Sequence, residues 1–192
     1  MKLSLSPGHY PESPGAIGEF NQKLATGGFR RITLYEHYEV LSVVAKTREF
    51  LSNNKDIKLV DTPISSLSGK VTTINESGAD LAIEIHLNST ENKNAFGPLC
   101  IAESKKGKEV SGKILNRINE IDQIQHDERI WDCMQLGRQL YFILQTKMPA
   151  VIVECFFLSN KSDLTWWIQG WNTAEILGQK IGMGIIDSLN LF

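Results

Sequence analysis

The chain has 192 residues, of which 42% are hydrophobic, and a formal net charge of −2. This length fits a single domain over residues 1–192, and the apolar content is enough for a substantial core, which excludes a disordered chain. Lys and Arg are scattered, and the closest group, Lys105, Lys106 and Lys108, is expected to be a solvated helix start, so nucleic acid is excluded as a partner.

The first quarter of the chain predicts one strand, a loop and a helix. The segment KLSL is expected to be a short strand that ends at Pro7. Residues 10–31 are rich in Gly and Pro and are expected to form a long loop, and loops of this length in compact domains are usually functional. From Tyr35, apolar residues at helical spacing predict a helix that stops at residues 53–54.

Two strands and a helix are predicted next. The segments DIKLVDT and DLAIEIH have the composition of strands. Between them, Thr62 is expected to cap a helix whose first residue is Pro63, with Ile64 on its apolar face and Gly78 at its end.

The second half predicts two more strands and two helices. GPLCIAE is expected to be the fourth strand, and a helix follows over the apolar positions from Val110 to Ile121. Residues 122–139 are ambiguous, and QLYFIL is interpreted as a short edge strand. PAVIVECFF is expected to be a central buried strand that ends at Glu154, and a last helix is predicted over 173–189. This alternation predicts an α/β fold with a mainly parallel, twisted sheet and helices on both faces.

Four polar residues are expected to meet at one edge of this sheet. His9 follows the first strand, His86 ends the third, and Glu154 ends the strand after PAVIV. Carboxyl ends of parallel strands lie along one edge, where such folds build their sites. Glu36 opens the first long helix at the end of the loop that His9 begins. Taken alone, His86 is better explained as a core histidine or as a cap of the following turn, and Glu36 as a helix-dipole partner.

This combination of residues is suited to metal-assisted hydrolysis. Two histidines and one carboxylate with an open fourth position are a ligand set for catalytic zinc, and a second, unligated carboxylate supplies the acid/base. The chain contains no HExxH helix, which excludes the common zinc-peptidase architecture.

The segments SPGHYPESPGAIG, YEHYEVLSVVA, AIEIHLNS and PAVIVECFFLSN resemble, in order, the motif series of the zinc-dependent N-acetylmuramoyl-L-alanine amidases. These are cell-wall hydrolases that include many phage endolysins. The resemblance implies zinc bound by His9, Glu36 and His86, and Glu154 as the catalytic acid/base. It also implies a peptidoglycan substrate, cleaved at the amide between N-acetylmuramic acid and L-alanine.

Several residues depart from that pattern or have an open role. The family usually has Asp-Pro-Gly-His-Gly, whereas this chain has Ser6 and Tyr10 around the motif, and Tyr10 is expected to narrow the cleft. His37 is placed on the outer face of its helix, about 100° from Glu36. His126 matches no motif and is interpreted as a surface histidine. Glu84 shares a strand face with His86, so either a role beside the metal or a pairing elsewhere is open.

Competing functions are another zinc amide hydrolase, such as a peptidoglycan carboxypeptidase, a metal-free glycosidase that uses Glu36 and Glu154, and an inert wall-binding module of the same fold. The glycosidase leaves both histidines unexplained, and an inert module has no need of all four site residues. The tryptophans at 166, 167 and 171 are expected to pack in the core, with an aromatic docking patch as the alternative.

Cellular location is predicted from the N-terminus and the apolar runs. The apolar run in the segment MKLSLSPGHYPES is too short for a signal peptide. No apolar run in the sequence approaches the about 20 residues that a membrane helix needs. We therefore expect synthesis in the cytoplasm and action on the wall after release. The cysteines at 100, 133 and 155 are interpreted as reduced structural thiols, because they are odd in number and widely spaced.

Overall fold

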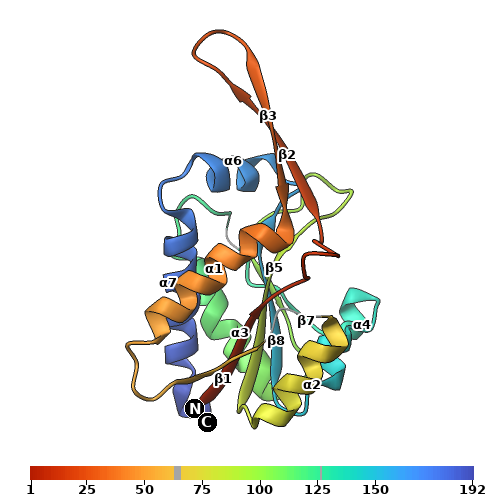
Figure 1. Ribbon diagram of the computed structural model, residues 1–192, viewed down its shortest axis with the longest axis vertical. Coiled ribbons are helices and arrows are strands. Elements are labelled where there is room, and N and C mark those ends of the chain that lie inside the picture. Colours follow the sequence, from red (N-terminus) through yellow and green to blue (C-terminus); the bar gives the residue numbers. More distant parts are fainter. Residues whose placement is uncertain (63–65, 126) are drawn as a thin grey trace.

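The computed structural model describes residues 1–62, 66–125 and 127–192. Within these residues, six strands form one sheet in the order β4-β1-β5-β8-β6-β7 (Figure 1). The strands are β1 (Lys2–Pro7), β4 (Lys58–Val60), β5 (Leu81–Asn88), β6 (Leu99–Ile101), β7 (Ile130–Trp131) and β8 (Ala150–Phe157). All neighbouring pairs run parallel except β6 and β8, which are antiparallel. The prediction of a mainly parallel α/β fold is confirmed.

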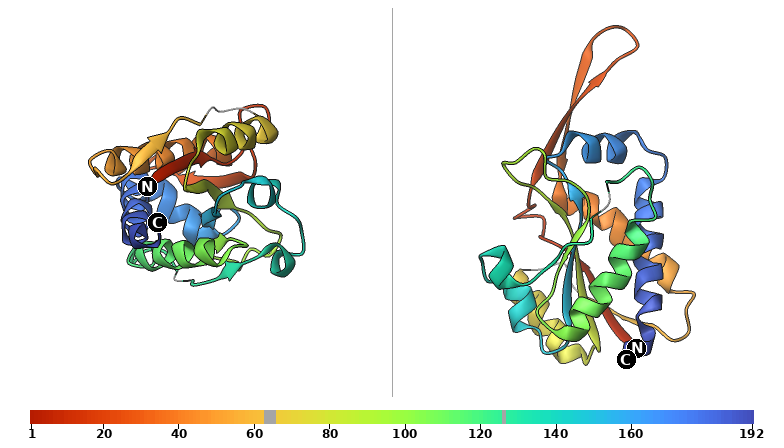
Figure 2. Two further views of the ribbon diagram at one scale, coloured as in Figure 1. Left: turned by 90° about the horizontal axis from the view of Figure 1, so that it is seen from below. Right: turned by 180° about the vertical axis from the view of Figure 1, so that it is seen from behind.

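Helices cover both faces of the sheet (Figure 2). The side chains of the central strands alternate between the two faces. Helices α1 (Glu36–Leu51), α3 (Lys105–Ile118) and α7 (Thr173–Asp187) cover one face, and α2 (Leu67–Ser77) and α5 (Tyr141–Gln145) cover the other. In β8, Val151 and Val153 belong to the first core cluster, whereas Ala150 and Ile152 belong to the second. Burial on both sides explains the unbroken apolar run that predicted this strand.

The segment predicted as a long loop contains a β-hairpin instead. Strands β2 (Ile17–Lys23) and β3 (Phe29–Tyr35) pair antiparallel, and they project from the body at the end opposite the two termini (Figure 1). Gly27 has a φ of 89° in the turn between them, a conformation that glycine adopts without strain. The hairpin lies largely in solvent, so its sequence lacks the apolar alternation of a half-buried strand.

Helix α2 begins later than predicted. Its first residue is Leu67, and Ser66 caps it by accepting a hydrogen bond from the Gly69 amide. Thr62 lies outside the helix, with its Oγ1 2.9 Å from Ser4 Oγ. The part of the prediction that concerned Pro63 and Ile64 falls outside the described residues.

Other predicted elements differ in extent or type. The segment QLYFIL contains helix α5 rather than an edge strand, and the strands at the two edges of the sheet are β4 and β7. Strand β8 continues past Glu154 to Phe157, because the apolar residues after Glu154 are also buried. The remaining helices are α4 (Cys133–Leu136), α6 (Lys161–Gln169) and the short 3-10 helix η1 (Leu189–Leu191).

As predicted, the cysteines are free thiols and the lysines lie at the start of a helix, whereas only part of the tryptophan cluster packs in the core. All three cysteines are free and buried, and α3 begins at Lys105 after its N-cap Ser104. Trp167 is buried against Phe156, whereas Trp171 is 85% exposed. In the described part of the chain, no helix combines the length and apolar character needed to cross a membrane.

Candidate metal centre

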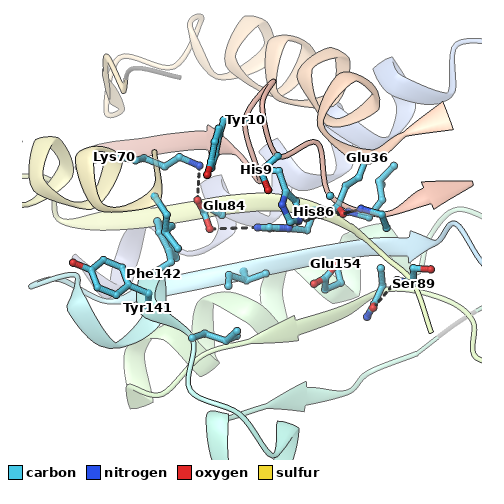
Figure 3. Close-up of a pocket in the computed structure, with 18 of the residues that line it drawn as sticks. His9, Tyr10, Glu36, Lys70, Glu84, His86, Ser89, Tyr141, Phe142 and Glu154 are labelled. Atoms are coloured by element: carbon cyan, nitrogen blue, oxygen red, sulfur yellow. Dashed lines mark hydrogen bonds and ion pairs between the residues drawn. The ribbon is translucent and has the colours of Figure 1, made fainter. Parts of the chain in front are cut away.

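The predicted site residues lie together in one pocket at the carboxyl edge of β1, β5 and β8 (Figure 3). The pocket has a volume of about 510 Å³, within the range of small-molecule sites. His9, Glu36, His86 and Glu154 all line it. The prediction that strand ends and a helix start would bring these four residues together is therefore confirmed.

His9 reaches the pocket from a tight turn after β1. The Gly8 amide donates to the Ile85 carbonyl at 2.7 Å, which continues the parallel pairing with β5 for one residue beyond the strand. His9 then takes a left-handed conformation with a φ of 59°, which is uncommon for a residue other than glycine and recurs at functional sites. The chain turns sharply there and directs the imidazole towards Glu36.

Two glycines leave room for this arrangement. A Cβ at Gly8 would lie 2.2 Å from His86 Cε1, and a Cβ at Gly15 would lie 2.4 Å from Glu36 Oε2. Any side chain at either position would displace a predicted metal ligand.

Glu36 is the first residue of α1 and lies between the two histidines. Its Oε2 accepts from the Ala16 amide at 2.8 Å and lies 3.2 Å from His9 Nε2, while its Oε1 lies 2.9 Å from His86 Nδ1. Burial acts to raise the pKa of Glu36, but hydrogen bonds from His86 and His9 outweigh it and hold the pKa well below its ordinary value. Glu36 is therefore a buried carboxylate anion.

His86, near the end of β5, is held between two carboxylates. Its Nδ1 faces Glu36, and its Nε2 lies 3.3 Å from Glu84 Oε2. Burial acts to lower the pKa of His86, but the bonds to Glu36 and Glu84 raise it to about 10. In the metal-free protein both ring nitrogens therefore carry protons and donate to the carboxylates.

These residues fit a divalent metal ion. One ligand atom each from His9, Glu36 and His86 can be chosen so that all three lie within 4.8 Å of one another. Two imidazoles and a carboxylate are a common protein ligand set for such ions. In the metal-free protein the Nδ1 proton of His86 lies on the side of the ring that faces Glu36, where positive charge is already stabilised.

Glu154 lies beside this cluster and outside it. In the sheet it is the register partner of His86, and the residue is only 8% exposed. Its Oε2 has no hydrogen-bond partner within the described residues. Burial, assisted by the nearby negative charge of Glu36, raises the pKa of Glu154 to about 7, although the positive charge of His86 opposes the shift. A buried, unpartnered carboxyl group that titrates near neutrality is suited to moving protons.

The placement of His37 on the outer face of its helix is wrong. His37 is buried, and its Nδ1 lies 3.2 Å from the Gly8 carbonyl oxygen. His37 does not line the pocket that contains the cluster. It is covered nevertheless, because its ring contacts the Gly8 carbonyl in the turn that carries His9.

The residues around the cluster are also placed. Tyr10 lines the pocket, as expected. Ser6, at the position where the family motif usually has aspartate, is buried, and its register partner on β5 is Glu84. The neighbouring strand therefore carries a carboxylate beside Ser6. Glu84 pairs with a lysine and also contacts His86, so the two interpretations left open for it do not exclude each other. His126 lies outside the described residues.

The sequence reading missed Lys70 and Arg138, which also line the pocket. A signal for Lys70 was present: it lies three residues after Leu67 and four before Ile74, on the apolar face of α2. A lysine at such a position needs a buried partner. Arg138 lies after α4 in the segment that was ambiguous, and no periodic pattern marked it.

A mainly parallel α/β sheet with a His/Glu/His cluster at its carboxyl edge and a free carboxylate beside it defines a metallohydrolase type of site. A family model described as N-acetylmuramoyl-L-alanine amidase matches residues 3–187, and the chain belongs to this family. The resemblance inferred from the four sequence motifs is confirmed.

The chain is also similar to individual relatives. An uncharacterised 38.4 kDa protein of Clostridium perfringens is 25% identical over 199 residues, which cover 99% of this chain and 52% of the relative, so the chain spans about half of that protein's length. The fold matches the N-acetylmuramoyl-L-alanine amidase AmiC2 of Nostoc punctiforme with a TM-score of 0.79 at 19% identity, covering 99% of this chain and 97% of that one. Cwp6 from Clostridium difficile matches with a TM-score of 0.75 at 27% identity, covering 97% of this chain and 29% of that one.

Proposed function

We propose that this protein hydrolyses the amide between N-acetylmuramic acid and L-alanine in peptidoglycan, with zinc held by His9, Glu36 and His86 and with Glu154 as the acid/base. The family supports the reaction and the substrate class. The cluster supports a metal of the zinc type, since imidazole and carboxylate ligands suit zinc.

Zinc, when bound, supplies a Lewis acid that polarises the amide carbonyl and lowers the pKa of water. The protein residues supply position and proton transfer. Glu36 is anchored by the Ala16 amide and by the Leu87 amide, whose nitrogen is 3.2 Å from Oε1, so the carboxylate stays in place between the histidines.

Glu154 accepts a proton from the attacking water and donates it to the leaving amine of L-alanine. Its free Oε2 and its raised pKa support this role, because a base with a pKa near the working pH can both take and return a proton. The proposal rests above all on this observation: among the described residues, a buried carboxyl oxygen of Glu154 has no hydrogen-bond partner and lies in the same pocket as the candidate metal ligands.

The geometry disfavours the glycosidase alternative. A glycosidase needs two carboxyl groups that can act on the glycosidic bond. Both oxygens of Glu36 are engaged by histidines and backbone amides. Glu36 therefore cannot serve as the second free carboxyl group that a glycosidase would need beside Glu154. The inert-module alternative is disfavoured because the whole cluster and Glu154 are present in one pocket.

Digestion of purified walls tests the proposal. The zinc-loaded protein should release new free amino groups and no new reducing ends, chelation should abolish the release, and added zinc should restore it. New reducing ends would indicate a glycosidase, and neither product would indicate an inert module. Activity that persists after complete removal of metal would contradict the role of zinc.

A further inference from the structure

A lysine and a glutamate are buried together beside the metal-ligand cluster (Figure 3). Lys70 Nζ lies 2.6 Å from Glu84 Oε1, and both side chains are almost fully shielded from solvent. Burying a pair of charges is costly, and two apolar residues of similar size are often at least as stable. The pair is therefore poorly explained as a source of stability alone.

Both charged groups contact the segments that carry the histidines of the cluster. Glu84 uses its second oxygen, Oε2, to contact His86 Nε2 at 3.3 Å. Lys70 Nζ also donates to the Pro7 carbonyl at 2.6 Å, two residues before His9. One ammonium group thus connects the end of β1, which leads to His9, with the strand that carries His86.

We propose that Glu84 and Lys70 are positioning residues for the metal centre, in which Glu84 holds the proton of His86 on Nε2 so that Nδ1 binds the metal. The inference rests on the proposed function, because it assumes that His86 is a metal ligand.

The contacts of His86 support this choice of nitrogen. Nδ1 faces Glu36 at 2.9 Å, on the side of the cluster, while Nε2 faces Glu84 on the opposite side of the ring. A neutral imidazole has one protonated nitrogen and one with a free lone pair, and a carboxylate acceptor next to Nε2 selects the form with its lone pair on Nδ1. Metal-binding histidines commonly donate their other nitrogen to such an acceptor.

Lys70 has a separate task in this arrangement. It occupies Glu84 Oε1, while His86 occupies Oε2, so neither oxygen of Glu84 is free to become a further metal ligand. Its positive charge also offsets that of Glu84 in a pocket that already contains Glu36 and Glu154. A fourth coordination position on the metal would thereby be left for substrate or water.

Two double variants separate the acceptor from the buried charges. Lys70→Met with Glu84→Gln removes both charges but keeps an oxygen that can accept from His86 Nε2. Lys70→Met with Glu84→Met removes the charges and the acceptor. Zinc affinity is measured by competition with a chelator of known affinity. A matched control, Lys180→Met with Glu120→Met, removes a Lys–Glu pair of the same 2.6 Å separation outside the pocket.

The variant without an acceptor should bind zinc about 10–100-fold more weakly than the variant that keeps one. The control pair should retain wild-type affinity. Equal zinc affinity in the two Lys70/Glu84 variants would overturn the inference and leave the metal site itself intact. Failure of the wild-type protein to bind zinc would instead overturn the proposed function on which the inference depends.

A measurement on the unaltered protein decides the question even if a variant does not fold. In zinc-loaded protein with ¹⁵N-labelled histidine, the ring resonances of His86, assigned through their correlations with its backbone, should show a protonated Nε2 and a metal-bound Nδ1. A metal-bound Nε2 would overturn the inference, because Glu84 could not then hold the proton there.

Discussion

Replacing Glu154 with glutamine should stabilise the metal-free protein at neutral and alkaline pH while removing most of its activity. The carboxyl group is buried, and its pKa rises from 4.5 to about 7, a difference worth roughly 3 kcal/mol of unfolding free energy. Between these two pH values the folded protein holds the proton more tightly than the unfolded chain does. The contribution of this group is therefore fully present below pH 4.5 and is lost as the pH rises through about 7.

Glutamine does not titrate, so this loss should be absent from the variant. Urea unfolding of both metal-free proteins at pH 5 and pH 8 measures the effect. Relative to the wild type, the variant should gain up to about 3 kcal/mol of unfolding free energy when the pH is raised from 5 to 8. Comparing the two proteins at each pH cancels the titration of groups that they share.

The activity should change in the opposite direction. Loss of a general base typically lowers the rate by about 10²–10⁴-fold, which corresponds to roughly 3–5 kcal/mol on the barrier. Release of amino groups from walls measures this loss, and the zinc content should remain that of the wild type. Glu39→Gln is a matched control, because Glu39 accepts from Trp167 Nε1 at 2.8 Å and does not line the pocket. It should retain activity.

Two results would refute this reasoning about Glu154. Activity of the glutamine variant within a few-fold of the wild type would show that Glu154 is not the acid/base. A stability difference that does not change between pH 5 and pH 8 would show that its carboxyl group is not perturbed by burial.

Three further predictions concern the ligands and their surroundings. His86→Ala should lose most of the about one zinc per chain that elemental analysis should find in the wild type; full retention would remove His86 from the ligand set. Zinc affinity should rise with pH, because the pKa of His86 in the metal-free protein is raised to about 10 and zinc must displace a proton from it. Titration calorimetry in several buffers should detect the release of this proton. Gly8→Ala should abolish zinc binding and cost about 1–3 kcal/mol of stability, since its Cβ would lie 2.2 Å from His86 Cε1. The control Gly112→Ala, whose Cβ would have its nearest atom at 3.9 Å, should fold normally. Normal zinc binding by Gly8→Ala would contradict the close packing.

The convergence of the site could be predicted because it depends on strand direction. His9 follows β1 and His86 lies near the end of β5, and parallel strands such as these end at the same edge of the sheet whatever their detailed pairing. Glu36 was found because a clear helical pattern begins next to it. Errors in strand length, such as the placement of Glu154 at the end of β8, do not move a residue to another edge.

Features that depend on tertiary contacts could not be predicted in the same way. The β2–β3 hairpin has little apolar alternation, because most of it contacts solvent rather than the core. His37 was misplaced because helical geometry gives the angle between two side chains but does not say which side of the helix is covered. Lys70 was missed because its partners, Glu84 and Pro7, lie on other elements.

Mass spectrometry of the products from purified walls tests the central proposal most directly. After digestion by the zinc-loaded protein, the account predicts stem peptides that begin with a free L-alanine amino group, and glycans whose muramic acid carries a free lactyl carboxylate. Peptides cut within the stem, or sugars with new reducing ends and peptides still attached, would contradict it.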